Sequence, residues 1–253
     1  MDLGLTDHVY VVTGGSRGLG RATADALVAD GARVVISSRS EVNVDNAVVA
    51  LGRERTIGVA GDLGDPELPQ RLLDAAQDHF GRVDGALVSV GGPPRGTALE
   101  TPDSDWSDAF ESVFLGTLRM ARLTASTQAA GHGGSVAVVL STTAKSPAGD
   151  LAISNGFRPG LGMVVKQLAD EVGPQGVRVN GLMPGRIATD RIRELDAHRT
   201  DPGVLDEKNS GIALGRTGEP PEFGRVAAFV LSPAASYVTG AMIPVDGGVS
   251  RGL

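Results

Sequence analysis

A chain of 253 residues, 41% hydrophobic and 21% charged, has a globular composition and the length of one large α/β domain, which we expect to span residues 1–253. The formal net charge of −7 argues against a nucleic-acid or anionic-membrane partner, and the absence of cysteine excludes disulfides, thiolate catalysis and zinc-finger sites. No stretch approaches the roughly 18 apolar residues of a membrane span, and no export signal precedes the first predicted strand, so we expect a cytoplasmic protein.

Short β-branched runs alternate with helix-length amphipathic stretches along the chain. Most runs are apolar throughout, as in strands buried on both faces of a parallel sheet. The runs cover residues 9–13, 33–37, 56–61, 85–90, 135–140, 177–182 and 241–245. The clearest helical patterns cover residues 19–30, 66–80 and 157–173. This order predicts an α/β fold of the Rossmann type, a doubly wound parallel sheet of about seven strands with helices on both faces.

The segment TGGSRGLG (13–20) follows the first predicted strand and opens a helix. Gly14 permits a sharp turn, Gly18 lets the backbone approach a pyrophosphate, and Gly20 allows the helix to pack closely on the strand. The amino end of the helix offers N–H groups and the positive end of its dipole to the anion. The same glycines could form a tight turn and nothing more, but their place between strand and helix favours dinucleotide binding.

The second predicted strand ends in Ser37, Ser38 and Arg39, without the carboxylate that usually binds the ribose hydroxyls of NAD. Arg17 lies within the glycine turn itself. Two guanidinium groups at the adenosine ribose would hold a 2′-phosphate through charge-assisted hydrogen bonds, so we favour NADP(H) over NAD(H). The alternative is that both arginines face only solvent.

The motif TGGSRGLG, the order of the predicted strands and the ending SYVTGAMIPVDGG (236–248) resemble the short-chain dehydrogenase/reductase family from end to end. The similarity is closest to its ketoacyl-carrier-protein-reductase-like members. The resemblance implies a single Rossmann-type domain, hydride transfer between a nicotinamide cofactor and a small-molecule substrate, and a homo-oligomer, a tetramer or a dimer. The stretch 188–215 is rich in charge, Pro and Gly, and we predict that it forms a substrate lid.

Further cofactor contacts follow from the resemblance. Asp62 matches the acidic residue that pairs with the adenine amino group, and RVNGLMPGRIAT (178–189) matches the strand and loop beside the nicotinamide. The complete set of candidate cofactor-binding residues is Gly14, Ser16, Arg17, Gly18, Leu19, Gly20, Arg39, Asp62, Leu63, Gly91, Pro184, Gly185, Ile187 and Thr189.

The catalytic positions of the family are only partly kept. Ser141, in VVLSTTAK, matches the catalytic serine after the fifth strand. Ser154 stands where the family has its catalytic Tyr, and Arg158 stands where it has Lys. Val113 occupies the position of the active-site Asn, and Ser-Val-Gly-Gly (89–92) replaces Asn-Asn-Ala-Gly.

A shifted alignment does not restore the missing pair. The only tyrosines are Tyr10, in the first predicted strand, and Tyr237, near the last one. Lys166 lies eight residues beyond Arg158, about 12 Å farther along a helix. The two substitutions are therefore real.

Ser154 is a poor substitute for the tyrosine, because a serine hydroxyl is a far weaker acid than a phenol of pKa near 10 and is shorter by a ring. A positioned general acid contributes about 10²–10⁴-fold in rate, so its loss slows hydride transfer without abolishing it. Arg158 keeps the positive charge, can hydrogen-bond a ribose and can stabilise a developing oxyanion. A guanidinium group stays protonated, so Arg158 cannot relay protons.

Three other residues are candidates for the missing function. Lys145 follows Ser141 by four positions, but a lysine that only faces solvent is the favoured interpretation. Arg95, in GGPPRG, could bind a carboxylate or phosphate of the substrate, although an exposed loop arginine is again favoured. Asn155 could donate an amide hydrogen bond or cap the helix. The catalytic candidates are thus Ser141, Ser154, Arg158 and Lys145.

Other chemistries find little support in the sequence. The four histidines, His8, His79, His132 and His198, are scattered, and none has a spacing that would pair it with Ser141 as in a serine hydrolase. The acidic residues form no metal-ligand pattern, so we expect no metal.

Two hypotheses follow. The first is an NADP(H)-dependent oxidoreductase that acts on a ketone or a secondary alcohol with a non-standard proton-donor site. The second is a catalytically silent or non-redox relative that binds the nucleotide as a scaffold or regulator, motivated by the loss of three catalytic positions at once. The intact glycine turn motivates the first but separates the two only partly, because a silent relative can keep its nucleotide as a structural ligand.

Overall fold

The computed structural model describes residues 2–190, 192 and 211–252. Its centre is a parallel sheet of seven strands in the order β3-β2-β1-β4-β5-β6-β7. The strands are β1 (Val9–Thr13), β2 (Arg33–Ser38), β3 (Thr56–Ala60), β4 (Gly85–Val88), β5 (Gly134–Val139), β6 (Val177–Pro184) and β7 (Met242–Val245). The predicted doubly wound sheet is therefore confirmed.

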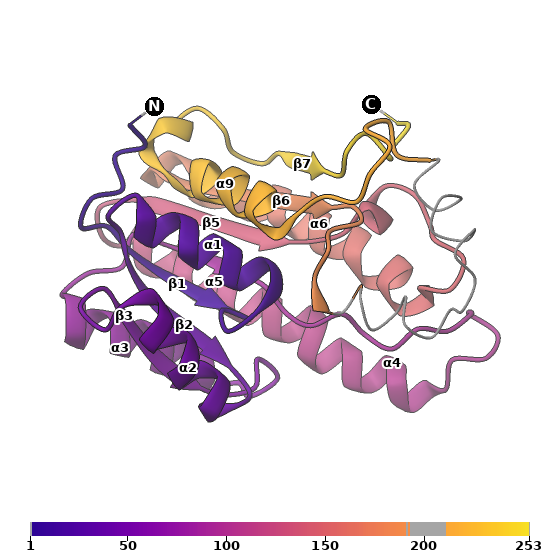
Figure 1. Cartoon of the computed structure of the whole chain (residues 1–253), viewed down its shortest axis with the longest axis horizontal. Helices are drawn as coiled ribbons and strands as arrows, with labels where there is room; N and C mark the ends of the chain where they lie inside the picture. Colours follow the sequence, from indigo (N-terminus) through magenta and orange to yellow (C-terminus); the bar gives the residue numbers. More distant parts are fainter. Residues whose placement is uncertain (1, 191, 193–210, 253) are drawn as a thin grey trace.

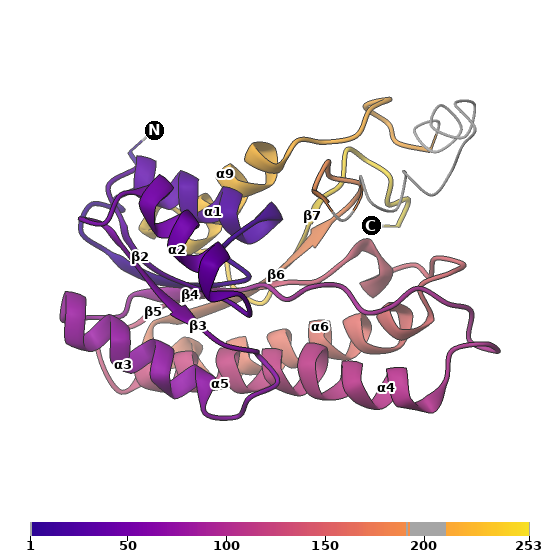
Figure 2. The same ribbon diagram turned by 60° about the horizontal axis from the view of Figure 1, so that its bottom comes forward.

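Helices cover both faces of this sheet, as Figure 2 shows in profile. One face carries α1 (Gly18–Ala29), α2 (Glu41–Leu51) and α9 (Pro220–Leu231). The other carries α3 (Leu68–Phe80), α5 (Gly116–Ala129) and α6 (Ala152–Val172). The helix α4 (Asp103–Ala109) continues through a π-helical turn, η1 (Phe110–Leu115), into α5. Short 3₁₀ turns η2 (Thr142–Ala144), η3 (Gly173–Gln175) and η4 (Pro233–Ala235) complete the described elements.

Two apolar cores lie on the two sides of the sheet, because the strands are apolar on both faces. Val11 and Val35 pack toward α3 and α5, whereas Val12 and Ile36 pack toward α1 and α9. Since all strands are parallel, their carboxyl ends form one edge, to the right of β5 in Figure 1. Loops at that edge are where ligands bind in open α/β sheets.

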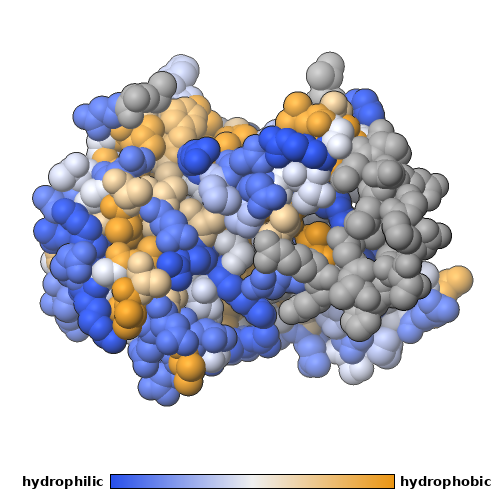
Figure 3. All heavy atoms as spheres, in the orientation of Figure 1, coloured by the Kyte–Doolittle hydropathy of each residue, from blue (hydrophilic) through white to orange (hydrophobic). Residues whose placement is uncertain are grey.

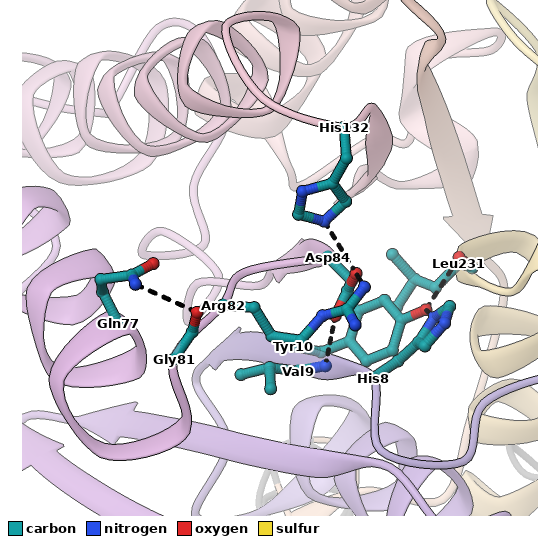
Figure 4. A network of polar contacts seen from close by, with 9 residues as sticks. All are labelled: His8, Val9, Tyr10, Gln77, Gly81, Arg82, Asp84, His132 and Leu231. Atoms are coloured by element: carbon teal, nitrogen blue, oxygen red, sulfur yellow. Dashed lines mark hydrogen bonds and ion pairs between the residues drawn. The ribbon is translucent and has the colours of Figure 1, made fainter.

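The opposite edge is held by a polar network around Asp84, which precedes β4 (Figure 4). The Asp84 carboxylate is 6% exposed and accepts hydrogen bonds from Val9 N–H at 2.8 Å and from Arg82. His132 Nε2 lies 3.1 Å from the same group. Burial alone would raise the pKa of Asp84, but these hydrogen bonds bring it below its ordinary value. The network ties β1 to β4 and to the turn before β5.

Hydrophilic residues predominate on the face seen in Figure 3, and hydrophobic ones are scattered over it. No helix among the described residues is long and apolar enough to cross a membrane.

Candidate active site

The glycine turn has the geometry of a phosphate cradle. Gly14 and Gly18 adopt left-handed φ values of 61° and 58°, which side chains rarely tolerate. A Cβ at Gly20 would lie 2.3 Å from the Gly14 carbonyl oxygen, so only glycine lets α1 approach β1 this closely. The amino end of α1 has no side-chain cap from its N-cap residue Arg17. Its first N–H groups thus fit a pyrophosphate.

The two predicted 2′-phosphate ligands lie at the same edge. Arg17 and Arg39 are both exposed, and neither pairs with an acidic side chain in the part of the chain that the structure describes. The neighbouring Ser40 caps α2 by accepting a hydrogen bond from Asn43 N–H at 3.3 Å. The charge of both guanidinium groups is therefore available to an anion.

Asp62, the predicted adenine ligand, lies on the turn that follows β3. Its Oδ1 accepts a hydrogen bond from Gly64 N–H at 2.8 Å, which fixes the carboxylate without neutralising it. The neighbouring Leu63 is 7% exposed and packs into the core on the α3 and α5 side.

The loop after β6 approaches the glycine turn. Gly185 N–H donates to Val245 O at 3.0 Å, and Ile187 pairs with Gly218 in an isolated β-bridge. Thr189 lies so close to Gly18 that a Cβ there would be 3.5 Å from its methyl group. A cavity of about 220 Å³ is lined by both segments. Most of the predicted lid, 188–215, lies outside the described residues.

Ser141 follows β5 and caps the turn η2, where its Oγ accepts a hydrogen bond from Thr143 N–H at 3.2 Å. Ser154 lies in the first turn of α6, and its Oγ is 2.9 Å from the Oγ1 of Thr143. Thr143 thus contacts both serines. The structure thereby brings Ser154 next to the turn of Ser141.

Arg158, one turn farther along α6, is 4% exposed. Its Nη1 donates a hydrogen bond to the carbonyl oxygen of Val139, the last residue of β5, at 2.7 Å. One arm of the guanidinium group is therefore directed at the sheet. It supports the end of the strand from which Ser141 emerges, a contact that the sequence does not predict.

Val113 lies in the π-helical turn η1 and is 3% exposed. It packs against Ile153, the residue before Ser154, in a small cluster that also contains Ala109, Trp106 and Phe157. Val113 thus makes an apolar contact behind Ser154. A polar group there would have no such packing.

The three additional candidates have different surroundings. Lys145 is exposed on the turn after η2, in agreement with a solvated lysine. Arg95 forms an ion pair with Asp150, so its charge is already engaged. Asn155 exchanges two hydrogen bonds with the backbone of Ala148, at 2.8 and 3.0 Å, which engage both its amide oxygen and its amide nitrogen.

These contacts join the loops that follow β4 and β5. Gly96 and Leu151 form an isolated parallel bridge, and Ala152 N–H donates to Gly96 O at 3.1 Å. Together with the ion pair of Arg95 and Asp150, the bridge holds the two loops side by side. A cavity of about 300 Å³, lined by Ala98, Pro147, Ala148, Gly149, Ala152 and Asn155, opens beside them.

No other catalytic set competes with these residues in the described part of the chain. His8 and His132 lie at the Asp84 edge, far along the strands from Ser141, and His79 packs edge-to-face against Phe80. Tyr10 donates to Leu231 O at 3.3 Å, and burial raises the pKa of its phenol. The described residues contain no group of three potential metal ligands.

Sequence reasoning missed Thr143 and the carbonyl of Val139. A hydroxyl residue two positions after Ser141 is a signal that was readable, because a 3₁₀ turn brings residues this close together. The carbonyl gives no such signal, since any residue would supply it.

Comparison with known proteins places these features in a family. Residues 14–250 match the family model described as "Enoyl-(Acyl carrier protein) reductase". The short-chain reductase protein NovJ of Streptomyces niveus is 34% identical over 253 residues, covering 96% of this chain and 94% of its own. The L-rhamnose 1-dehydrogenase (NAD(P)(+)) of Azotobacter vinelandii is 31% identical over 259 residues, covering 97% of both chains.

A solved structure agrees with these relatives. The L-sorbose reductase of Gluconobacter frateurii, in complex with NADPH and L-sorbose, superposes with a TM-score of 0.93 at 29% identity, covering 100% of both chains. The seven-stranded parallel sheet with helices on both faces thus belongs to a known architecture. The chain is a member of the short-chain dehydrogenase/reductase family.

Proposed function

We propose that the chain is an NADP(H)-dependent oxidoreductase that reduces a ketone or oxidises a secondary alcohol, with a non-standard proton-donor site. The observation that carries this proposal is the meeting of three segments at one edge of the sheet. The glycine turn follows β1, the turn of Ser141 follows β5, and the nicotinamide-side loop follows β6. A cradle for a dinucleotide therefore lies beside hydroxyl donors for a carbonyl oxygen.

Each residue has a defined task in this proposal. A reduced nicotinamide supplies the hydride. Ser141 donates its hydroxyl proton to a hydrogen bond with the carbonyl oxygen and polarises the C=O bond, and Ser154 adds a second donor. Arg158 contributes positive charge from behind the end of β5, close to where negative charge develops. Overall the ketone gains a hydride at carbon and a proton at oxygen.

The preference for NADP(H) is part of the proposal. It is supported by Arg17 and Arg39, which carry unneutralised charge at the expected position of the 2′-phosphate, and by the lack of a carboxylate at the end of β2. The similar L-sorbose reductase binds NADPH, whereas the similar L-rhamnose dehydrogenase is named for both cofactors.

The competing hypothesis is a silent or non-redox protein that holds the nucleotide as a scaffold. The burial of Arg158 and the apolar packing of Val113 favour it, because both positions have moved away from polar contact with a substrate. The two hypotheses agree on nucleotide binding and differ on turnover.

The experiment measures both nucleotide binding and turnover. Binding of NADPH and NADH is followed by fluorescence, and oxidation of NADPH is followed with L-sorbose, ethyl acetoacetate and acetoacetyl thioesters. L-rhamnose with NADP⁺ tests the reverse direction. Turnover by the parent that falls at least about 100-fold in Ser141→Ala, but not in Ser146→Ala on the same exposed loop, supports the oxidoreductase. Tight nucleotide binding without turnover supports the scaffold, and absence of binding contradicts both.

Three expectations complete the proposal. The chain forms one domain over residues 1–253, works in the cytoplasm on a small-molecule substrate, and assembles as a homotetramer or homodimer. Analytical ultracentrifugation tests the last of these directly.

A further inference from the structure

Thr143 contacts both serines of the candidate site, Ser141 through its backbone N–H and Ser154 through its side chain. Its N–H donates to Ser141 Oγ at 3.2 Å, and its Oγ1 lies 2.9 Å from Ser154 Oγ. Thr143 is 3% exposed and Ser154 is 7% exposed, so the contact between their hydroxyls is shielded from water. A hydrogen bond in such surroundings is stronger and better oriented than one in solvent.

The hydroxyl protons of Ser141, Thr143 and Ser154 determine how many hydrogen bonds these residues can donate to a ligand. Thr143 and Ser154 carry one hydroxyl proton each, and the bond between them uses one. No other described residue accepts a hydrogen bond from either oxygen. If Thr143 donates, the Ser154 proton is left to donate elsewhere. Ser141 accepts from a backbone N–H, so its own proton is likewise left for a ligand.

We propose that Thr143 is a positioning residue, which donates its hydroxyl proton to Ser154 and thereby aims the Ser154 hydroxyl at the substrate oxygen. Ser141 and Ser154 then form a pair of neutral donors in the place of a phenol. This inference rests on the oxidoreductase function proposed above. Thr143 itself does not touch the substrate.

Reduction of the carbonyl group in this site requires no side chain with a lowered pKa as its acid. A reduced nicotinamide, when bound, would supply the hydride with its electron pair to the carbonyl carbon and would itself be oxidised. The π electrons of the C=O bond then move to oxygen, and the two serine hydroxyls stabilise the resulting alkoxide by hydrogen bonds. The alkoxide takes its proton from a solvent water molecule, which leaves as hydroxide. Donation by Thr143 makes Ser154 a better hydrogen-bond donor, because hydrogen bonds in a chain polarise one another.

The residues around Ser154 fix its backbone, and the hydrogen bond to Thr143 sets the direction of its hydroxyl group. Ile153 on one side is 1% exposed and packs against Val113, and Asn155 on the other side is bound to the backbone of Ala148. The backbone of α6 is therefore fixed, but the short side chain of Ser154 has three staggered rotamers. The hydrogen bond to Thr143 selects among them.

The test uses the full chain and the ketone from the panel above that the parent reduces fastest. Thr143→Val keeps the shape and removes the hydroxyl, whereas Thr143→Ser keeps the hydroxyl. We expect kcat to fall roughly tenfold in Thr143→Val and to stay within about threefold of the parent in Thr143→Ser. The KM for NADPH stays within about twofold in both. Thr142→Val is the matched control, since the Thr142 hydroxyl makes no hydrogen bond with a described residue.

The double variant Thr143→Val with Ser154→Ala separates positioning from a general loss of packing. If Thr143 acts through Ser154, the double variant is no slower than Ser154→Ala alone. Additive losses, or an unchanged kcat in a folded Thr143→Val protein, would overturn the inference. Thr143→Ala replaces the valine variant if the latter does not fold. A parent protein that reduces none of the ketones contradicts the proposed function, and the positioning function of Thr143 is then contradicted as well. An active parent with an equally active Thr143→Val variant contradicts only the positioning function.

Discussion

Arg158 on α6 donates a hydrogen bond to the carbonyl oxygen of Val139, the last residue of β5, over 2.7 Å. The contact joins the helix that carries Ser154 to the strand that leads into Ser141. The two halves of the candidate site are therefore fixed to one another by a buried cation and a backbone carbonyl. Arg158 therefore stabilises the structure of the candidate site as well as contributing positive charge to it.

Replacing Arg158 is expected to affect stability and rate separately. Arg158→Met leaves the buried carbonyl of Val139 without this donor, which costs about 1–3 kcal/mol of the free energy of unfolding. Arg158→Lys keeps the charge and loses the planar geometry, so its kcat should fall less than that of Arg158→Met. Urea unfolding and steady-state kinetics measure the two effects. Equal kcat values in both variants would show that the charge has no part in the reaction.

The choice of cofactor is expected to depend on two arginines. Arg17→Ala and Arg39→Ala should each weaken binding of NADPH by roughly 10-fold, because each removes a charge-assisted hydrogen bond to the 2′-phosphate. Binding of NADH, which lacks that phosphate, should change less than about twofold. Fluorescence titration of both nucleotides gives the ratio. Arg21→Ala, at the next turn of α1, is the control, since Arg21 already pairs with Asp25 at 2.9 Å. An equal loss of affinity for NADH in these two variants would contradict recognition of the 2′-phosphate.

Gly156 is expected to be required by the packing of Trp106. A Cβ at Gly156 would lie 2.8 Å from the Trp106 ring, so Gly156→Ala should destabilise the protein by about 1–3 kcal/mol despite the better helix propensity of alanine. Gly162 lies in the same helix, but a Cβ there meets its nearest neighbour, the sulfur of Met242, at 3.6 Å. Gly162→Ala should therefore be neutral or stabilising. Thermal unfolding compares them, and equal shifts would refute the packing argument.

Asp84 is expected to make stability depend on pH below neutrality. Its pKa is lowered in the folded protein, so the unfolded chain binds the proton more tightly. The stabilisation is fully present above the unfolded pKa of about 3.9 and is lost as the pH falls through the lower folded value. Asp84→Asn should thus cost about 1–3 kcal/mol between pH 5 and 8, and the difference from the parent should shrink below about pH 4. A difference that is constant down to pH 2 would exclude the carboxylate as its cause.

The strands and the order of the elements could be predicted from the sequence because they depend on local patterns. The run 9–13 is β1 residue for residue, and the other runs agree with their strands to within two residues at each end. The helix predicted over 157–173 begins earlier, at Ala152, and runs through Gly156 and Pro159. Glycine and proline both disfavour the interior of a helix. Packing of Gly156 against Trp106 instead favours a continuous helix, although Pro159 cannot donate a hydrogen bond to Asn155 O.

The candidate site was predictable in position but not in its contacts. The glycine turn and Ser141 follow from local motifs, whereas the pairing of Arg95 with Asp150 depends on loops that are far apart in sequence. The engagement of Arg158 with Val139 depends on the depth at which α6 lies on the sheet. Such distances arise from the packing of whole elements, which no spacing in the sequence encodes.

The carboxylate of Asp84 and the hydroxyl cluster of Ser141 lie at opposite edges of the same sheet. Substitutions near the hydroxyls can therefore accumulate during evolution while the strands keep their alignment. Residues around the hydroxyl cluster can then be exchanged without disturbing the contacts that hold β1 to β4, so one fold can accommodate different sets of side chains at its ligand-binding edge.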